Sequence, residues 1–223
     1  MKTQERVEVF INVHKGLRQA LFGLGLKLGK TDWEDRTEVS QVETDFKKLL
    51  HFLREHASNE DNVNFPFLES RSPGAARNER DEHQRLEGVL NQLESDFKHL
   101  QETGDNRLKN GYLFYRAYNR FLSTYLAHMD REEGFITEAI YELFTDEEIE
   151  KDFQKIIKRT SPADMGMMLG FMIPGMNPPE RFKFLSKLRK TAPAEVFIKI
   201  KGLAQSGLPE TGWKKLSEKL ESV

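Results

Sequence analysis

Two histidine–glutamate pairs at one shared spacing constrain this 223-residue chain more than any other feature. Glu60 follows His56 by four residues, and Glu132 follows His128 by the same number. On an α-helix this offset turns about 400°, so the two side chains lie roughly 40° apart on one face and about 6 Å apart along the axis. Each pair can therefore close on a single metal ion.

Both pairs interrupt the apolar stripe of a long amphipathic pattern. Apolar residues recur in steps of three and four on either side of each pair, which is typical of the inward face of a helix. An ionised carboxylate without a partner is strongly disfavoured in such a core, so two of them indicate a bound cation. The stripes comprise Leu49, Leu53, His56, Glu60, Val63 and Phe67, and then Phe114, Tyr118, Phe121, Tyr125, His128, Glu132, Phe135 and Ala139.

Two further histidines lie on stripes of the same kind. Glu87 follows His83 by four residues and so repeats the offset a third time. Four predicted helices therefore each direct one imidazole inward. The two additional stripes comprise Phe10, His14, Leu17, Leu21, Leu24 and Leu28, and then Ala76, His83, Leu86, Leu90, Leu93 and Phe97.

The helical patterns predict an all-α protein, because no alternating period indicates strands. Long helices are expected over residues 6–29, 36–65, 75–101 and 108–144, and short connections between them favour antiparallel neighbours. We predict an up-down-up-down four-helix bundle in residues 1–144, with a C-terminal appendage of short helices in residues 145–223. The number of residues between each histidine and the adjacent turn places His56, His83 and His128 at the same level along the bundle axis. The corresponding count for His14 agrees less well.

Composition narrows the chemistry and the partners. The chain has no cysteine, so thiolate metal sites and disulfides are excluded and any metal must be held by nitrogen and oxygen. A formal net charge of −2 gives no reason to expect nucleic acid or an anionic membrane as a partner. Neither a signal peptide nor an apolar run long enough to span a bilayer is present, so we expect a cytoplasmic protein.

Taken together, these residues resemble the hemerythrin-like, or HHE cation-binding, family over about residues 5–144. The similarity rests on a lone His14, on His56-x3-Glu60 followed by Asp61 and Phe65-Pro66-Phe67-Leu68-Glu69, on His83, and on His128-x3-Glu132-Glu133. It implies two non-haem iron ions, with Glu60 and Glu132 as bridging carboxylates and terminal ligands from His14, His56, His83 and His128. Manganese and zinc accept the same ligand types.

Three more side chains are candidates for an additional ligand or for a partner of one. Oxygen-carrying hemerythrins have a second histidine where this chain has Glu87, and they take the last carboxylate at the position of Glu133. Helical geometry keeps Glu132 nearer the stripe, since Glu133 turns about 100° further round. Tyr125, three residues before His128, either packs in the core or donates a hydrogen bond at the site.

The resemblance implies a protein that binds, senses or reduces a small oxidant such as O₂, peroxide or NO, and it leaves open whether the protein is an enzyme. The alternative is an iron-handling or redox-sensing module that signals to another protein through the appendage. The segment Met165–Met176 holds five of the seven methionines. Methionine fills irregular cores and also lines pliable binding surfaces, so this segment either packs internally or binds a protein partner or a second copy.

Overall fold

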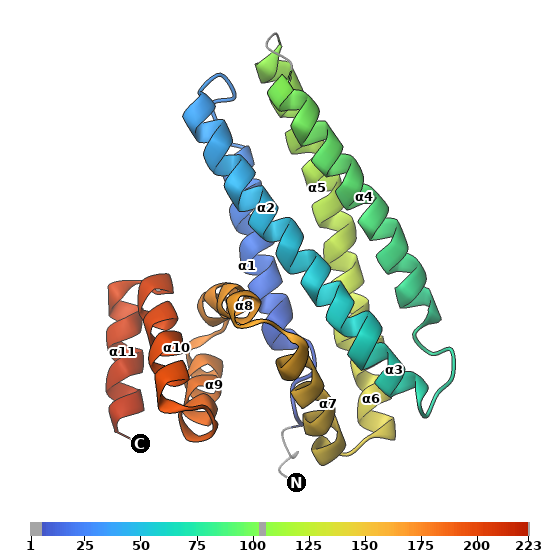
Figure 1. The fold of residues 1–223 in the computed structure, drawn as a ribbon, viewed down its shortest axis with the longest axis vertical. Coiled ribbons are helices and arrows are strands. Elements are labelled where there is room, and N and C mark those ends of the chain that lie inside the picture. The colour runs from blue at the N-terminus through green and yellow to red at the C-terminus, as the bar shows by residue number, and fades with distance from the viewer. Residues whose placement is uncertain (1–5, 103–105, 223) are drawn as a thin grey trace. The chain divides into compact units, whose positions relative to one another are not determined.

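The computed structural model describes residues 6–102 and 106–222 (Figure 1). Every regular element in these ranges is helical, which confirms the all-α prediction. None of the described helices is both long and apolar enough to cross a membrane. The elements are α1 (Ile11–Leu28), α2 (Arg36–Asn59), η1 (Glu60–Asn64), α3 (Phe65–Glu69), α4 (Arg77–Glu102), α5 (Arg107–Arg131), η2 (Glu132–Ile136), α6 (Thr137–Leu143), α7 (Asp146–Arg159), α8 (Pro162–Gly175), α9 (Pro178–Thr191), α10 (Ala194–Gly207) and α11 (Glu210–Glu221), where η marks a π-helical turn.

The chain divides into two compact units. The first contains Ala20–Arg159 together with the described residues up to Phe10, and the second contains Ile11–Gln19 and the chain from Thr160 onward. Helix α1 thus contributes its first half to one unit and its second half to the other. The domain boundary predicted between residues 144 and 145 stays a prediction, and α7 lies with the first unit.

In the first unit, α4 packs against both α5 and α2, and α4 runs in the opposite direction to α5 (Figure 1). Three phenylalanine rings join these helices: Phe114 lies 5.4 Å from Phe46 and 5.1 Å from Phe97 between ring centroids. The Tyr118 hydroxyl donates a hydrogen bond of 2.8 Å to the Leu21 carbonyl and so ties α5 to the second half of α1. Aromatic packing and one buried hydrogen bond therefore hold the long helices together.

Trp33, in the connection from α1 to α2, packs against a glycine of α5. The Trp33 ring meets Phe114 edge-on, with centroids 6.2 Å apart, and covers Gly111. A Cβ atom at Gly111 would lie 2.2 Å from the indole. Only glycine lets the ring approach this closely, so a side chain at position 111 would displace Trp33.

The stripe predicted for α4 is confirmed, because each of its six members is buried. On the two stretches that carry a His-x3-Glu pair, the stripe is right as far as the glutamate, and after Glu60 it is also right at Val63, but the last predicted members are wrong. Phe135 is 64% exposed, whereas the next residue, Ile136, is 0% exposed, and Ile140 replaces Ala139 in the core. After Glu60 the same shift puts Leu68 in the core and leaves Phe67 only half-buried.

A π-helical turn explains the shift in both places. A π turn makes i→i+5 hydrogen bonds and contains one more residue than an α turn, so it advances the inward face by one position. The Phe65 N–H donates to the Glu60 carbonyl, and the Thr137 N–H donates to the Glu132 carbonyl. The Thr137 hydroxyl adds a second hydrogen bond of 2.8 Å to that Glu132 carbonyl. Each π turn therefore begins at one of the two glutamates.

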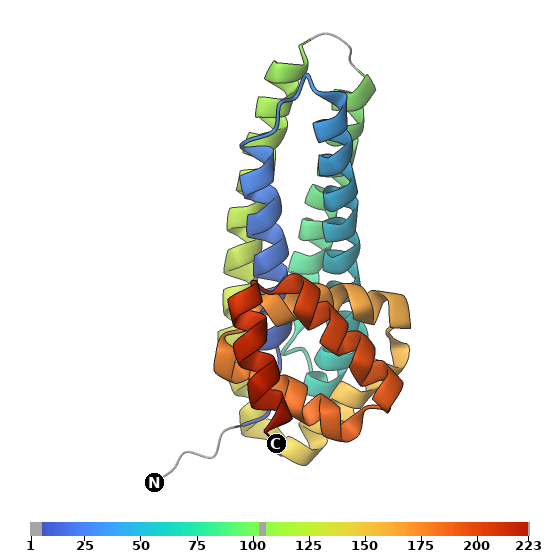
Figure 2. The same ribbon diagram turned by 90° about the vertical axis from the view of Figure 1, so that its left-hand side faces the viewer.

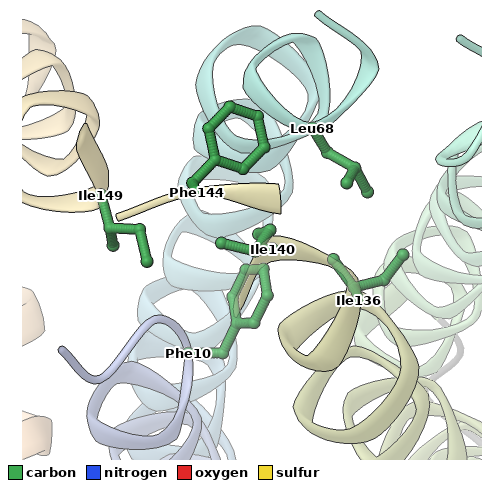
Figure 3. Close-up of a cluster of buried hydrophobic side chains, with 6 residues drawn as sticks. All are labelled: Phe10, Leu68, Ile136, Ile140, Phe144 and Ile149. Atoms are coloured by element: carbon green, nitrogen blue, oxygen red, sulfur yellow. The ribbon is translucent and has the colours of Figure 1, made fainter. Parts of the chain in front are cut away.

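The residues that the π turns rotate inward build one core cluster. Leu68, Ile136 and Ile140 form one buried cluster with Phe10, Phe144 and Ile149 (Figure 3). This cluster joins α3, η2, α6 and α7 with the segment before α1. The one-residue shift is thus stabilised by apolar burial, which is the largest favourable term in folding.

The second unit is built around α8, whose inward residues include Met168, Met172 and Ile173. α10 packs on α8, and α11 packs on α9 (Figure 2). The buried Arg181 guanidinium donates hydrogen bonds of 2.8 Å to the Ile173 carbonyl and 2.6 Å to the Met176 carbonyl, which satisfies carbonyls at the end of α8.

Candidate metal centre

Three continuous helical stretches of the first unit, α2–η1, α4 and α5–η2, bring five of the predicted ligands together. His56 lies in the last turn of α2 and Glu60 opens η1, while His128 lies in the last turn of α5 and Glu132 opens η2. His83 comes from the second turn of α4. All five side chains are buried, with Glu132 at 0% exposure.

The imidazole Nε2 atoms face the two carboxylates. The distance from His56 Nε2 to Glu60 Oε1 is 3.1 Å, and the distance from His128 Nε2 to Glu132 Oε1 is 3.2 Å. His83 Nε2 lies between both glutamates, at 3.4 Å from Glu60 Oε2 and 3.6 Å from Glu132 Oε1. Glu60, His83, His128 and Glu132 offer ligand atoms that all lie within 4.8 Å of one another.

This donor set fits a metal ion. His83 Nε2 and both ring nitrogens of His128 are buried, and within the described residues they have no hydrogen bond that meets geometric criteria. Buried polar atoms of this kind are rare in folded proteins unless an ion or water satisfies them. Nitrogen and oxygen donors that converge from three helical stretches suit iron, manganese or zinc.

The carboxylates also change the acid–base behaviour of His83. Burial alone would lower the pKa of this imidazole, because it disfavours the charged form. The hydrogen-bond contact with Asp61 and the nearby carboxylates of Glu132 and Glu60 outweigh burial and raise the pKa of His83 to about 12. The space between the glutamates therefore attracts positive charge, whether a proton or a metal ion carries it.

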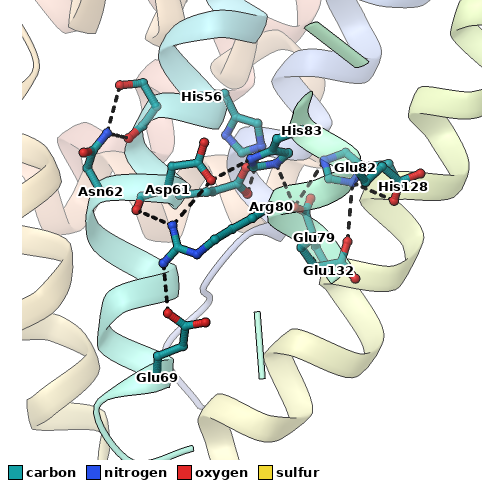
Figure 4. A network of polar contacts seen from close by, with 12 residues as sticks. His56, Asp61, Asn62, Glu69, Glu79, Arg80, Glu82, His83, His128 and Glu132 are labelled. Carbon is teal, nitrogen blue, oxygen red and sulfur yellow. Dashed lines mark hydrogen bonds and ion pairs between the residues drawn. The ribbon is translucent and has the colours of Figure 1, made fainter. Parts of the chain in front are cut away.

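On the side of His83 that faces away from Glu60 and Glu132, three polar residues contact one another in a row (Figure 4). The distance from His83 Nδ1 to Asp61 Oδ1 is 3.0 Å. Arg80 donates hydrogen bonds of 3.0 Å to the backbone carbonyl of Asp61 and of 3.0 Å to Glu69 Oε2. In the π register the N–H of residue 66 would bond to that Asp61 carbonyl, but Pro66 has none, so the carbonyl is left for Arg80.

His128 has acidic groups behind it as well. Its Nδ1 lies 3.6 Å from Glu79 Oε2 and 3.6 Å from Glu82 Oε2. Arg131 pairs with both glutamates, closely with Glu82 and at 3.9 Å with Glu79 Oε1. The pKa of the Glu79 carboxyl is lowered, mainly by the contact with His128 and further by the charge of Arg131.

Tyr125 stands directly beside the centre. Its ring meets His128 at a centroid distance of 5.5 Å and an interplanar angle of 68°. Burial raises the pKa of the hydroxyl well above its usual value, and the charges of Glu60 and Glu132 raise it further. The hydroxyl has no hydrogen-bond partner in the described ranges, so it is a neutral donor held next to the two carboxylates.

Two of the remaining candidates, Glu87 and Glu133, belong to none of the possible metal-binding groups in the described residues. Glu87 lies outside the cluster: its side chain is 45% exposed, and its Oε1 pairs with Arg54 Nε at 3.1 Å. Glu133 is half-buried, whereas Glu132 is fully buried in the cluster. His14 is fully buried in the first half of α1, the half that belongs to the second unit.

Sequence reasoning missed the residues behind the histidines, namely Glu79, Glu82, Arg80 and Arg131. Glu79 stands four residues before His83, so the same helical offset in reverse order was a usable signal. The arginines gave none, because each contacts its carboxylates through the fold rather than through sequence spacing alone.

Comparison with known families decides the identity of this arrangement. Residues 5–140 match the family model of the hemerythrin HHE cation-binding domain. The chain belongs to this family. No curated protein and no solved structure matches it. Membership of the hemerythrin family makes cation binding the general function, and the His/Glu cluster is where the described chain offers the ligands.

Proposed function

We propose that this hemerythrin-family chain holds a non-haem di-iron centre that binds or reduces a small oxidant such as O₂, peroxide or NO. One observation carries the proposal: three imidazole Nε2 atoms face two buried glutamates at 3.1 to 3.6 Å. A set of two carboxylates and several imidazoles has the charge and donor types that two divalent ions require.

The distances support bridging roles for both glutamates. Glu60 lies next to His56 and His83, and Glu132 lies next to His128 and His83. Each carboxylate thus has imidazoles on two sides, as a group that contacts two ions would need. We assign the remaining terminal position to His14, which is fully buried and is the lone histidine of the first helix in the family pattern.

We also propose that α1, α2 with its extension, α4, and α5 with its extension form an antiparallel up-down-up-down four-helix bundle. Contacts between α2 and α4 and between α4 and α5, and the hydrogen bond from Tyr118 to Leu21, support this arrangement. Bundles of this type build metal sites from side chains on facing helices. The five clustered side chains described above come from three of these segments.

Bound iron would supply electrons and Lewis acidity. The chain itself shapes the surroundings of the site. The Phe65 ring lies against His83 with a centroid distance of 5.3 Å, and Tyr125 lies against His128, so aromatic walls restrict the size of a ligand. The Tyr125 hydroxyl keeps its proton because burial and the nearby carboxylates raise its pKa, and it can donate a hydrogen bond to a small oxidant.

Absorption spectroscopy of the iron-loaded protein tests this proposal. We expect visible charge-transfer bands that change when the reduced protein meets O₂ or NO. The Tyr125→Phe variant should keep the bands and alter the response, because it loses only the hydroxyl. A reduced, iron-loaded protein whose spectrum responds to neither gas would contradict oxidant binding.

A second candidate function is redox sensing through the C-terminal unit. The two residues that follow His14 pack tightly on α8: a Cβ atom at Gly16 would lie 2.8 Å from Met172 Cγ, and one at Gly175 would lie 2.6 Å from the Lys15 carbonyl. A change at His14 would therefore reach α8 directly. Met165 and Met167 are half-buried and would be the part of Met165–Met176 that meets a protein partner or a second copy.

Sensing requires that hydrodynamic size or protease sensitivity differ between the metal-free, reduced and oxidised forms. Size-exclusion chromatography and limited proteolysis of the three forms measure this. Identical behaviour of all three would rule out signalling through α8.

A further inference from the structure

We infer that two similar polar relays position the metal-binding histidines from behind, one through Asp61 and one through the Glu79–Glu82 pair. This inference rests on the proposed metal centre and goes beyond it, because it assigns roles to residues that do not face the carboxylate pocket. In each relay a ligand histidine contacts a carboxylate through Nδ1, and an arginine joins that carboxylate to a second one. Figure 4 shows the first relay from His83 to Glu69.

The first relay runs His83, Asp61, Arg80, Glu69. Its histidine contact is 3.0 Å long, which is hydrogen-bond distance. Arg80 holds Asp61 in two ways, with a hydrogen bond of 3.0 Å to its carbonyl and a distance of 3.8 Å to its carboxylate. The missing N–H of Pro66 frees that carbonyl, so the π turn that carries Glu60 also builds the relay behind His83.

The second relay runs His128, Glu79, Arg131, Glu82. Here the Nδ1 atom lies 3.6 Å from each glutamate, which is too long for a hydrogen bond in this structure. Nδ1 of His128 and Oε2 of Glu79 are both buried, and within the described part of the chain neither has a hydrogen bond. A small rotation of the ring would satisfy both atoms at once.

The physical effect is to fix the tautomer of each ring. An Nδ1–H that donates to a carboxylate leaves the lone pair on Nε2, the atom that faces Glu60 and Glu132. The carboxylate also makes the imidazole a stronger donor toward a metal ion. Each arginine offsets part of the added negative charge, which lowers the cost of holding a carboxylate beside the ring.

Nitrogen-detected histidine NMR of the Zn(II)-loaded full chain tests the relays, because Zn(II) is diamagnetic and accepts the same ligands. In the wild type, His83 and His128 should both carry the proton on Nδ1 and bind the metal through Nε2. In Asp61→Ala the His83 proton signal should disappear, and Zn(II) affinity, measured by competition with a chelator, should fall about 10- to 100-fold.

Two further variants separate positioning from mere structural support. Asp61→Asn keeps a hydrogen-bond acceptor without the charge, so it should restore the His83 tautomer and part of the affinity. Glu79→Ala combined with Glu82→Ala should change the His128 signal and leave His83 as it is. Glu87→Ala is the matched control, since Glu87 also lies on α4 and pairs with an arginine, and within the described part of the chain it belongs to no His/Glu cluster.

The outcomes are distinct. Zn(II) bound through Nδ1 of either histidine in the wild type would overturn the relays alone, and this result does not depend on whether any variant folds. Wild-type affinity and an unchanged tautomer in folded Asp61→Ala would overturn the first relay as well. A wild-type chain that takes up neither Zn(II) nor iron would overturn the proposed metal centre and the relays together.

Discussion

Helix α4 and the continuous stretch from α5 through η2 to α6 both carry a metal-site histidine on an inward stripe, but only the second changes its helical period. The stripe of α4 keeps a regular α-helical step from Ala76 to Phe97. The stripe of the other stretch does so up to Glu132 and then moves by one residue, from Phe135 to Ile136. The change therefore accompanies the glutamate and not the histidine.

The stretch from α2 through η1 to α3 also contains a π turn that begins at its glutamate, and there the stripe moves from Phe67 to Leu68 while Val63 stays buried. In both places the first residue of the π turn is the buried glutamate, and its carbonyl accepts from the N–H five residues later. Single π turns inside α-helices often occur at functional sites. We therefore interpret the two π turns as part of the metal centre, and the following predictions test that interpretation.

Removing the carboxylate that opens a π turn should have the largest effect. Glu132→Ala should lose the second iron equivalent almost completely, because a bridging carboxylate serves both ions. Glu133→Ala, one residue along and only half-buried, should keep two equivalents. Iron analysis of both purified variants measures this, and the opposite result would make Glu133 the ligand.

Deleting Gly134 should reduce iron binding without unfolding the chain. The deletion shortens η2 by one residue, so Ile136 and Ile140 fall on the regular α-helical stripe after Glu132 and stay in the core. Thermal unfolding should remain cooperative while at least one iron equivalent is lost. Deleting Ser123 in the regular part of α5 is the control, since it rotates all later residues by about 100° and should unfold the chain. Full iron content after the Gly134 deletion would show that the π turn has no role at the site.

Two neighbouring alanine substitutions test the one-residue shift itself. Ile136→Ala should lower the free energy of unfolding by about 2–5 kcal/mol, as is usual when a large aliphatic side chain is removed from a core. Phe135→Ala should change it by less than about 0.5 kcal/mol, because Phe135 lies at the surface. Urea unfolding of both variants gives the comparison, and a larger loss for Phe135→Ala would contradict the π turn.

The smallest effect is expected on α4, where the period is regular. Glu87→His should leave iron content and the autoxidation rate unchanged, because the Glu87 carboxylate pairs with Arg54 outside the cluster. Loss of such an exposed ion pair should cost about 0–1 kcal/mol of stability. Slower autoxidation of the variant would instead make Glu87 a ligand.

Much of the fold was predictable because apolar periodicity determines which helix face is buried. The stripes of α1 and α4 and the inward positions of His56, Glu60, His83, His128 and Glu132 all follow from steps of three and four. The one-residue shifts were not predictable from that period, although Pro66 was a signal in one case. The relays behind the histidines depend on contacts between elements, such as Arg80 with Glu69, and helical spacing does not contain that information.

Anaerobic titration of the metal-free wild-type chain with ferrous iron tests the central proposal most directly. Two carboxylates, each facing imidazoles on two sides, predict saturation at two equivalents of iron per chain, with both equivalents depending on His56, His83 and His128. Saturation at one equivalent, or no uptake at all, would contradict the di-iron centre.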